Sequence, residues 1–401
     1  MRKKHFLFAS VLALLCGSST LHAQDFKLTS SGYFKNQGVD VMAFDDIYPE
    51  GHQGGVCIIM NGHRVATNGD IRLEATPGQW QPVPKQLDRK LGDNSITATL
   101  CYPDSSRHLT GFNPMIYPDL HLIYTVNVES KGKNIEVTVD LDRPIPQEFI
   151  GKVGFNLEFF PGSLFGKPWI MDGQSGIFPQ QPNSPLMTTQ PNYLHTGNYH
   201  DGKKSLADMD KLIGKGYSPI VADDIISEPY AKGTKFTSRP DDPYNKVTIE
   251  SLSGDLQLFD GRMNHNNGWF VLRSNIKPGV TKGAVKWIIT PNVVADWMYQ
   301  PVIQTSQIGY HPTQDKEAVI EMDIRDNRKE TAQIIRIDAD GEKVVKNVTP
   351  ANWGKFLRYN YLKVNFTDVK EPGLYKIKYN TSVSPIFRID NDVYARGVWQ
   401  P

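Results

Sequence analysis

The sequence predicts an all-β protein in which a large antiparallel β-sandwich is followed by a smaller, immunoglobulin-like β-sandwich. Two observations favour this class. The 401 residues include 27 prolines and 33 glycines, which divide the chain into short segments. Many of these segments alternate apolar and polar residues with a period of two, as in a strand that buries one face. A two-sheet supersandwich fits the length of the first part of the chain.

The first predicted domain, residues 24–298, contains a clear hairpin. Residues 135–141 alternate strictly, and a turn at 130–134 separates them from an earlier strand that ends near Val128. A single short helix is expected at 205–216, where apolar residues recur on one face and glycines close the segment. Further strand-like runs occur at 153–160, 247–258, 269–273 and 284–290.

The first 23 residues predict export. A basic start at 2–4, an apolar run at 6–15 and a small-residue cleavage site ending at Ala23 are typical of a signal peptide. The apolar run is too short to span a bilayer, which takes about 20 residues. We therefore expect a removed signal peptide, no membrane span, and a mature protein in the periplasm, on the cell surface or outside the cell. Lipidation of Cys16 is the alternative.

Charge and cysteine content exclude several classes of protein. The formal net charge is +1 with both signs interspersed, so the basic surface of a nucleic-acid binder is missing. Beyond the signal peptide only Cys57 and Cys101 remain, both in apolar, strand-like segments. They form either one disulfide or two buried thiols, and they are too few for a thiolate metal site. We expect no cofactor and no metal.

The chain beyond about residue 300 has the regular strand spacing of an immunoglobulin-like sandwich. Its expected strands are 318–323, 332–337, 343–348, 362–366, 374–379 and 386–389. The Asp-Ala-Asp-Gly segment at 338–341 superficially resembles a calcium loop. Because such a loop needs further ligands at fixed spacing, a hairpin turn is the better interpretation.

Several motifs in this second domain follow one another in a specific order. They are 306–312 (SQIGYHP), 316–319 (KEAV), 364–368 (VNFTD), 371–375 (EPGLY), 384–389 (SPIFRI) and 393–394 (VY). Together they resemble the N-terminal immunoglobulin-like domain of family 9 glycoside hydrolases, over about residues 301–395. The order of the two predicted domains resembles that of Bacteroidetes-type polysaccharide-utilisation enzymes.

This resemblance carries implications for catalysis and partners. In that family the domain packs on an (α/α)₆ barrel that hydrolyses β-1,4-glucans such as cellulose with inversion at the anomeric carbon. Inverting hydrolysis takes two carboxyl groups about 6.5–9.5 Å apart, and in the family both belong to the barrel. The resemblance therefore implies an immunoglobulin-like domain at 299–395, the start of a barrel at 396–401, and no catalytic residue in this chain. The implied partners are a catalytic barrel and a β-glucan polysaccharide.

The leading hypothesis is a non-catalytic portion of a secreted cellulase that braces the barrel. The alternative is a free-standing glycan-binding protein that uses the first domain, and a hydrolase in the first domain is a third hypothesis. Glycan binding requires exposed aromatic rings that stack on sugars. Trp80, Trp169 and Trp269 lie among polar and turn-forming residues and are the candidates, but packing in the core or against a loop is the favoured interpretation of each. Trp287 and Trp297 lie in apolar runs and are predicted to be core residues.

Acidic and histidine pairs are weaker candidates for a site. Successive residues of a strand point to opposite faces, so an acidic doublet is not in itself a catalytic pair. Loop charges and turn caps are the favoured interpretation, with a calcium or carbohydrate site at 45–52 as the alternative. His195 and His200 would need a third ligand to bind zinc. The acidic doublets are Asp45-Asp46, Asp223-Asp224 and Asp241-Asp242.

Overall fold

The computed structural model describes residues 25–45, 54–74, 76–77, 84–102, 120–182, 227–263 and 268–395. In these residues nearly all regular structure is β, in four antiparallel sheets, so the predicted all-β class is confirmed. None of their helices is both long and apolar enough to cross a membrane. The helix expected at 205–216 lies outside the described residues. The helical turns are η2 (Gln147–Phe149), η3 (Pro161–Ser163) and η7 (Gly261–Met263).

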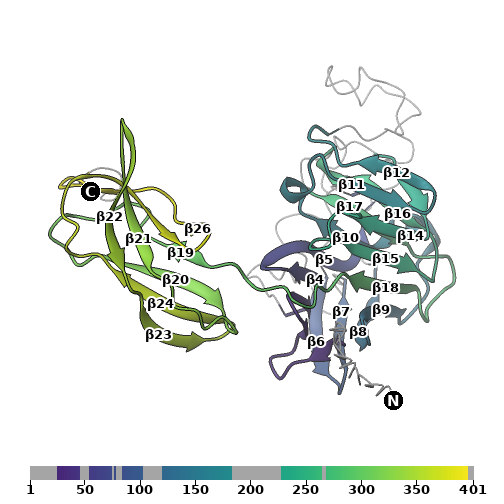
Figure 1. The fold of residues 1–401 in the computed structure, drawn as a ribbon. Coiled ribbons are helices and arrows are strands. Elements are labelled where there is room, and N and C mark those ends of the chain that lie inside the picture. The colour runs from purple at the N-terminus through teal and green to yellow at the C-terminus, as the bar shows by residue number, and fades with distance from the viewer. Residues whose placement is uncertain are drawn as a thin grey trace, which may run out of the picture.

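Two nine-stranded sheets form the first sandwich (Figure 1). The first sheet has the order β1 (Lys27–Leu28), β2 (Phe34–Asn36), β3 (Val39–Ala43), β4 (Val56–Met60), β5 (His63–Leu73), β10 (Val153–Phe159), β17 (Phe270–Asn275), β16 (Leu256–Asp260) and β13 (Ala231–Gly233). The second has the order β12 (Gln174–Ile177), β11 (Pro168–Met171), β14 (Lys235–Ser238), β15 (Val247–Ser251), β18 (Val285–Pro291), β9 (Asn134–Leu141), β8 (Ile123–Lys131), β7 (Ser95–Cys101) and β6 (Lys85–Leu91).

One hydrophobic core connects these two sheets. The predicted hairpin is present as β8 and β9, which pair from Tyr124 opposite Leu141 to Lys131 opposite Asn134. Across the core, the rings of Phe155 and Trp287 meet edge to face with centroids 4.9 Å apart. The side chain of Trp287 is buried, as predicted. Such aromatic contacts add specific geometry to the burial of apolar area.

The two cysteines lie in different sheets of the first sandwich. Cys57 belongs to β4 of the first sheet, and Cys101 belongs to β7 of the second. Both are buried thiols, and the Cys101 thiol donates to the carbonyl oxygen of Lys85 at 3.6 Å. Of the two alternatives that the sequence left open, two buried thiols rather than one disulfide is the observed one.

The second sandwich has a core of its own, which begins at Ile303. One sheet has the order β19 (Val302–Gln304), β20 (Glu317–Asp323), β24 (Tyr359–Asn365) and β23 (Ala351–Phe356). The other has the order β22 (Gly341–Val348), β21 (Ala332–Asp338), β25 (Gly373–Tyr379) and β26 (Ser382–Val383), and β27 (Phe387–Ile389) also pairs with β25.

The 338–341 segment is a hairpin turn between β21 and β22. Asp338 lies opposite Gly341 in the ladder, so Ala339 and Asp340 form a two-residue loop. Gly341 has a φ of +127°, which residues with a side chain rarely adopt. The interpretation as a hairpin rather than a calcium loop is therefore confirmed.

The 306–312 motif is tied to the second core through Tyr310. The Tyr310 ring lies 5.1 Å from Phe366 and 5.3 Å from Phe387, centroid to centroid. Its hydroxyl donates to the carbonyl oxygen of Glu317 and accepts from the backbone N–H of Ser306, each at 3.0 Å. This tyrosine therefore fastens the segment before β20 onto the sandwich.

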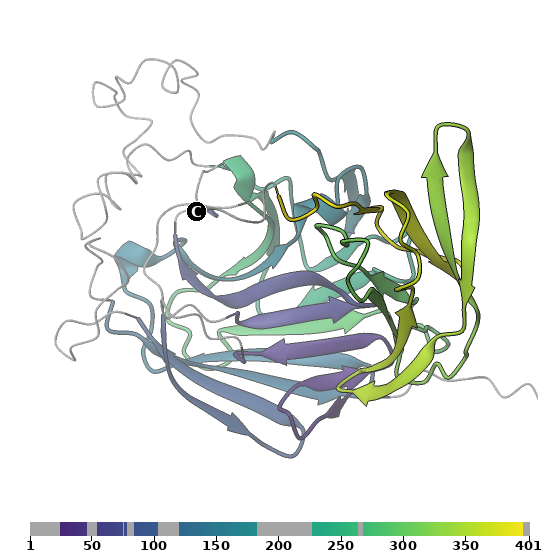
Figure 2. The ribbon, with the colours of Figure 1, turned by 90° about the vertical axis from the view of Figure 1, so that its left-hand side faces the viewer.

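The two sandwiches lie side by side and are joined by the segment between β18 and β19 (Figure 1). Figure 2, a view from the side of the second domain, shows the strands of the first domain in layers behind it. Gln37 Nε2 donates to the carbonyl oxygen of Trp297 at 2.7 Å, and Arg358 pairs with Asp40 at 3.2 Å. The first contact holds the linking segment, and the second links the first sheet to the second domain.

Gly309→Ala should destabilise the second domain strongly. Gly309 has a φ of +98°, and an added Cβ would lie 2.2 Å from the carbonyl oxygen of Arg388. We expect a loss of at least about 3 kcal/mol in the free energy of unfolding, measured by urea denaturation. Gly354→Ala, at a φ of +123° with open space around it, should cost only about 1–2 kcal/mol. Equal losses in the two variants would contradict a steric cause.

Candidate functional sites

The structure places two of the three predicted sugar-stacking tryptophans. Trp169 lies in the first core with 6% of its surface exposed, and an added Cβ at Gly176 would meet its ring at 2.4 Å. It therefore presents no open face to a sugar. Trp269 is half-buried and meets Phe160 edge to face at 4.5 Å. Trp80 lies outside the described residues, so glycan binding at Trp80 and Trp269 stays a prediction.

One acidic doublet, Asp241-Asp242, is described in full, and its second residue has a structural role. Asp242 accepts from the backbone N–H of Tyr244 and from Asn245 Nδ2, each at 2.8 Å, and pairs with Arg239 at 2.5 Å. It is a turn cap, as the sequence favoured. Asp45 lies 3.8 Å from Arg89.

The remaining acidic and histidine candidates cannot be placed. The residues Asp46, Glu50, His52, His195, His200, Asp223 and Asp224 lie outside the described ranges. Within those ranges, no three His, Cys, Asp or Glu side chains are grouped so that they could hold a metal ion.

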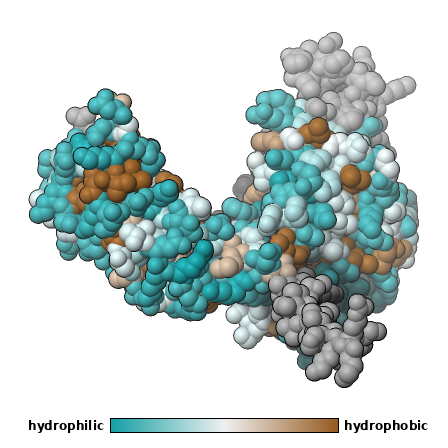
Figure 3. Space-filling model, viewed as in Figure 1, coloured by the Kyte–Doolittle hydropathy of each residue, from teal (hydrophilic) through white to brown (hydrophobic). Residues whose placement is uncertain are grey.

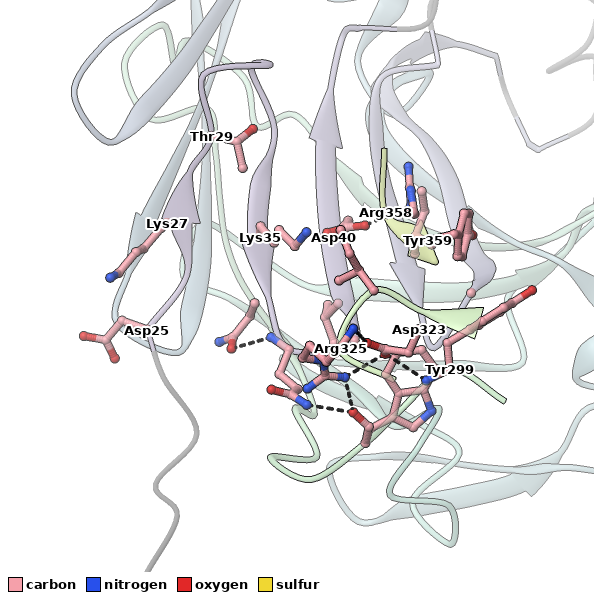
Figure 4. Close-up of a pocket in the computed structure, with 18 residues that line it drawn as sticks. Asp25, Lys27, Thr29, Lys35, Asp40, Tyr299, Asp323, Arg325, Arg358 and Tyr359 are labelled. Atoms are coloured by element: carbon pink, nitrogen blue, oxygen red, sulfur yellow. Dashed lines mark hydrogen bonds and ion pairs between the residues drawn. The ribbon is translucent and has the colours of Figure 1, made fainter. Parts of the chain in front are cut away.

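A cavity of about 430 Å³ lies between the two domains (Figure 4). The first domain contributes charged side chains from its first three strands, among them Lys27, Lys35 and Asp40. The second domain contributes Tyr359, the first residue of β24, and Arg358, the residue before it. The lining thus combines aromatic rings with groups that donate and accept hydrogen bonds, which is the composition of a site for a polar organic ligand.

Asp323 organises the side of this cavity that belongs to the second domain. It accepts from Arg325 in a bidentate arrangement at 2.8 and 2.7 Å and from the backbone N–H of Tyr299 at 3.0 Å. Burial acts to raise the pKa of Asp323, but these hydrogen bonds outweigh it and hold the pKa at about 2. Arg325 also donates to the carbonyl oxygen of Trp297 at 2.7 Å, which fixes the linking segment.

A continuous row of aromatic rings runs from this cavity across the outer face of the β19–β20–β24–β23 sheet. We call it the aromatic row, and its members in order are Trp297, Tyr299, Tyr359, Tyr361 and Trp353. Successive ring centroids are 6.4, 5.1, 6.1 and 5.6 Å apart. Tyr359 and Tyr361 share a face because they are two residues apart on β24. Tyr361 lies opposite Glu321 of β20, and Trp353 lies where β23 shifts its register against β24.

Glu321 fixes the centre of the aromatic row. Its carboxylate accepts from the hydroxyl of Tyr299 at 2.9 Å and from the hydroxyl of Tyr361 at 3.3 Å. Partial burial and the adjacent carboxylate raise the pKa of both tyrosines above the usual value. The two hydrogen bonds to Glu321 hold both rings in defined orientations.

The far end of the aromatic row is open to solvent at the edge strand β23. Trp353 is 56% exposed and Phe356 is 57% exposed. Together with Tyr361, Val319 and Lys363 they line an apolar cavity of about 200 Å³. Exposed aromatic side chains gathered around a cavity mark a binding surface more often than a packing defect.

The opposite sheet of the second sandwich presents a different, aliphatic surface. Its outward-facing exposed residues are Val344 of β22, Leu374 of β25 and Val383 of β26, with Ile386 beside them. Figure 3 shows hydrophobic surface gathered on the second domain around β21, β22 and β26. We call this the aliphatic face. Exposed aliphatic side chains gathered on one face of a sheet favour contact with another protein surface.

A buried cluster of charged residues lies where β5, β10 and β17 meet in the first sheet. Glu74 accepts from Asn156 Nδ2 at 2.6 Å and from Arg273 at 3.2 Å. Asp70 accepts from the hydroxyl of Tyr124 at 2.9 Å. Burial raises the pKa of Glu74 to about 7 and that of Asp70 to about 6, against the opposing effect of the nearby arginines.

These shifts make the cluster a source of pH-dependent stability. A folded-state pKa of Glu74 near 7, against an ordinary value of 4.5, means that the folded protein holds a proton that the unfolded chain releases between these pH values. Stability is therefore fully present below about pH 4.5 and declines as the pH rises through 7. The charges of Arg72 and Arg273 limit the decline.

The aromatic row was not recognised as a site from the sequence. Its signal was present in the Tyr-Asn-Tyr start of β24, because a period of two places Tyr359 and Tyr361 on one face. Trp297, which was predicted to be a core residue, is instead half-buried beside Gly38 at the joint. The prediction of a core position for Trp297, which rested on its apolar neighbours in the sequence, was therefore wrong.

Comparison with known proteins identifies the second domain by type. Residues 298–384 match the model of the cellulase N-terminal ig-like domain. The matched residues include β19 to β26, so they carry both the aromatic row beyond Trp297 and most of the aliphatic face. An immunoglobulin-like domain of the cellulase-associated, non-catalytic type is therefore present in this part of the chain.

Two solved structures are similar to the chain over different lengths. A metagenome-derived glycoside hydrolase family 9 endoglucanase is 30% identical over 23% of this chain, with a TM-score of 0.21. The matched part is only 18% of that enzyme. The Slr1438 protein from Synechocystis sp. PCC 6803 is 10% identical over 73% of this chain and 100% of that protein, with a TM-score of 0.32. No curated protein matches the chain.

Glu74→Gln should flatten the pH dependence of stability. We expect the wild-type protein to lose on the order of 2 kcal/mol of unfolding free energy between pH 5 and pH 8, because ionised Glu74 is buried. The variant should lose much less, as measured by urea unfolding followed through tryptophan fluorescence. Glu250→Gln, at a surface carboxylate, is the control. Parallel pH profiles for wild type and Glu74→Gln would contradict the assignment.

Proposed function

We propose that the chain is the non-catalytic part of a secreted family 9-type glycoside hydrolase that degrades β-glucan, and that its second domain braces a catalytic barrel. The match of residues 298–384 to the cellulase N-terminal ig-like domain is the observation that carries this proposal. The motifs at 306–312 and 371–375 support the same enzyme family. In this arrangement the barrel supplies the two carboxyl groups that inverting hydrolysis requires.

The aliphatic face is the surface proposed to contact the barrel. Leu374 is 47% exposed and lies opposite Ile337 in the ladder, so both side chains are on the outer side of the sheet. Lys376 and Lys378 follow Leu374 on the same side of β25, and Lys378 lies directly opposite Val383, so polar groups lie among the aliphatic side chains. Protein interfaces of the non-obligate kind combine apolar and polar groups in this way.

Bracing acts through linked stability. A barrel that binds the folded second domain, and not its unfolded chain, stabilises the complex by mass action. Covering the aliphatic face removes apolar surface from water on both partners, and each square ångström contributes roughly 25 cal/mol before the costs of association. The barrel then gains rigidity from a domain that performs no chemistry itself.

Leu374→Glu should weaken association with a family 9 catalytic barrel that was expressed without its own immunoglobulin-like domain. We expect at least a tenfold increase in Kd, measured by biolayer interferometry, because the substitution places a charge in an apolar interface. The melting temperature of the free chain should change little, since Leu374 is already half exposed.

Leu252→Glu is the matched control for this experiment. Leu252 is 61% exposed on the first domain and lies outside the aliphatic face, so its substitution should leave the Kd unchanged. Equal weakening by both variants, or no association of the wild-type chain with the barrel, would contradict bracing.

Export is the second part of the proposal and is supported by the basic start, apolar run and cleavage site in the first 23 residues. We expect the protein secreted by a bacterial host to begin at Gln24, as determined by intact-mass spectrometry of the exported fraction. A retained N-terminus, or a lipid attached to Cys16, would contradict cleavage after Ala23.

A further inference from the structure

We propose that the aromatic row binds an extended polysaccharide chain, which enters at the joint between the domains and leaves at the edge strand β23. This inference deepens the proposed function, on which the choice of a β-glucan as ligand rests. The surface itself follows from geometry alone. It lies on the opposite side of the second sandwich from the aliphatic face, so glycan and barrel can bind together.

The continuity of the row is the first argument. Five rings follow one another from Trp297 to Trp353 with no gap between centroids larger than 6.4 Å. Each end of the row opens into a cavity, about 430 Å³ at the joint and about 200 Å³ at the edge strand. A compact ligand would occupy one of these cavities. A linear chain of sugar rings can extend along the aromatic row from one cavity to the other.

The distribution of polar groups is the second argument. Sugars present apolar C–H faces and a rim of hydroxyls, so their sites combine aromatic rings with donors and acceptors. At the joint, Arg358 and Asp40 form a partly exposed pair beside Tyr359, and Lys35 lies nearby. At the far end, Lys363 lines the cavity with Tyr361 and pairs with Glu317 at 2.8 Å.

The rigidity of the row is the third argument. Glu321 holds the hydroxyls of Tyr299 and Tyr361, and Asp323 holds the backbone of Tyr299, so these rings lose little freedom when a ligand binds. The mixture of positive and negative groups along the row suits a neutral ligand better than a strongly anionic one. A neutral, hydroxyl-rich, linear polymer meets each of these requirements.

The two faces of the second sandwich differ in their chemistry. The aliphatic face is built from Val344, Leu374 and Val383, whereas the row is built from Tyr and Trp with a central carboxylate. Tyrosine and tryptophan combine ring stacking with hydrogen bonding, which suits a sugar chain, but they are also common in protein interfaces. A barrel docked on the row is therefore an outcome that the experiment must distinguish.

The test is the affinity of the full-length mature chain for soluble β-glucans, measured by isothermal titration calorimetry with mixed-linkage glucan, xyloglucan and hydroxyethylcellulose. We expect the wild-type chain to bind at least one of them and Trp353→Ala to weaken binding at least tenfold. Tyr361→Phe should weaken it less than Tyr361→Ala, because the phenylalanine keeps the ring. Leu374→Ala, on the aliphatic face, should bind as tightly as wild type.

Folding and alternative sites are controlled in the same series. Trp353 is exposed, so its replacement should shift the melting temperature by no more than about 2 °C. The proposal is overturned if none of the three glucans binds, if Trp353→Ala and Tyr361→Ala bind normally, or if affinity is lost only on Trp269→Ala in the first domain. It is also overturned if Trp353→Ala abolishes barrel association but not glucan binding. The effect of Leu374→Glu on association with the barrel tests only the bracing proposal. Its outcome does not change what the glucan titrations say about the aromatic row.

Discussion

The second domain depends on the strict alternation of side chains along β24. Leu362 and Val364 point into the sandwich and are fully buried, so Tyr359 and Tyr361 point away from it. A register slip of one residue would bury the tyrosines and expose the core residues. The packing of Leu362 and Val364 in the core therefore also places Tyr359 and Tyr361 on the outer face of the sheet.

Two chemically different surfaces result from this packing. One sheet carries rings held by Glu321, and the other carries aliphatic side chains such as Leu374. Because the sheets form opposite layers of one sandwich, ligands on the two surfaces do not compete for space. The domain is thus suited to hold a catalytic partner on one side and a polymer on the other.

The joint connects this arrangement to the first domain. Trp297 lies against Gly38, where an added Cβ would meet its ring at 2.7 Å, and its carbonyl oxygen accepts from Gln37 and Arg325. The cavity at the joint has walls from both domains. Loss of these contacts would open the first end of the aromatic row without unfolding either core.

The sequence revealed what depends on local pattern. Period-two alternation predicted the β8–β9 hairpin, and the Asp-Gly turn at 340–341 predicted the join of β21 and β22. The sequence did not reveal which side chains would be brought together by the pairing of strands that are far apart in the chain. Glu74 meets Arg273 because β5 and β17 both flank β10, and Tyr299 meets Tyr359 because the chain returns across the sheet. Trp169 is buried, in keeping with the packing role that the sequence also allowed.

Hydrogen–deuterium exchange of the exported chain, alone and with each partner, tests the division between the two faces most directly. A soluble β-glucan should slow exchange in β23 and β24, and a family 9 barrel should slow it in β21, β22 and β25. Protection of the same strands by both partners, or of strands in the first domain alone, would contradict the account.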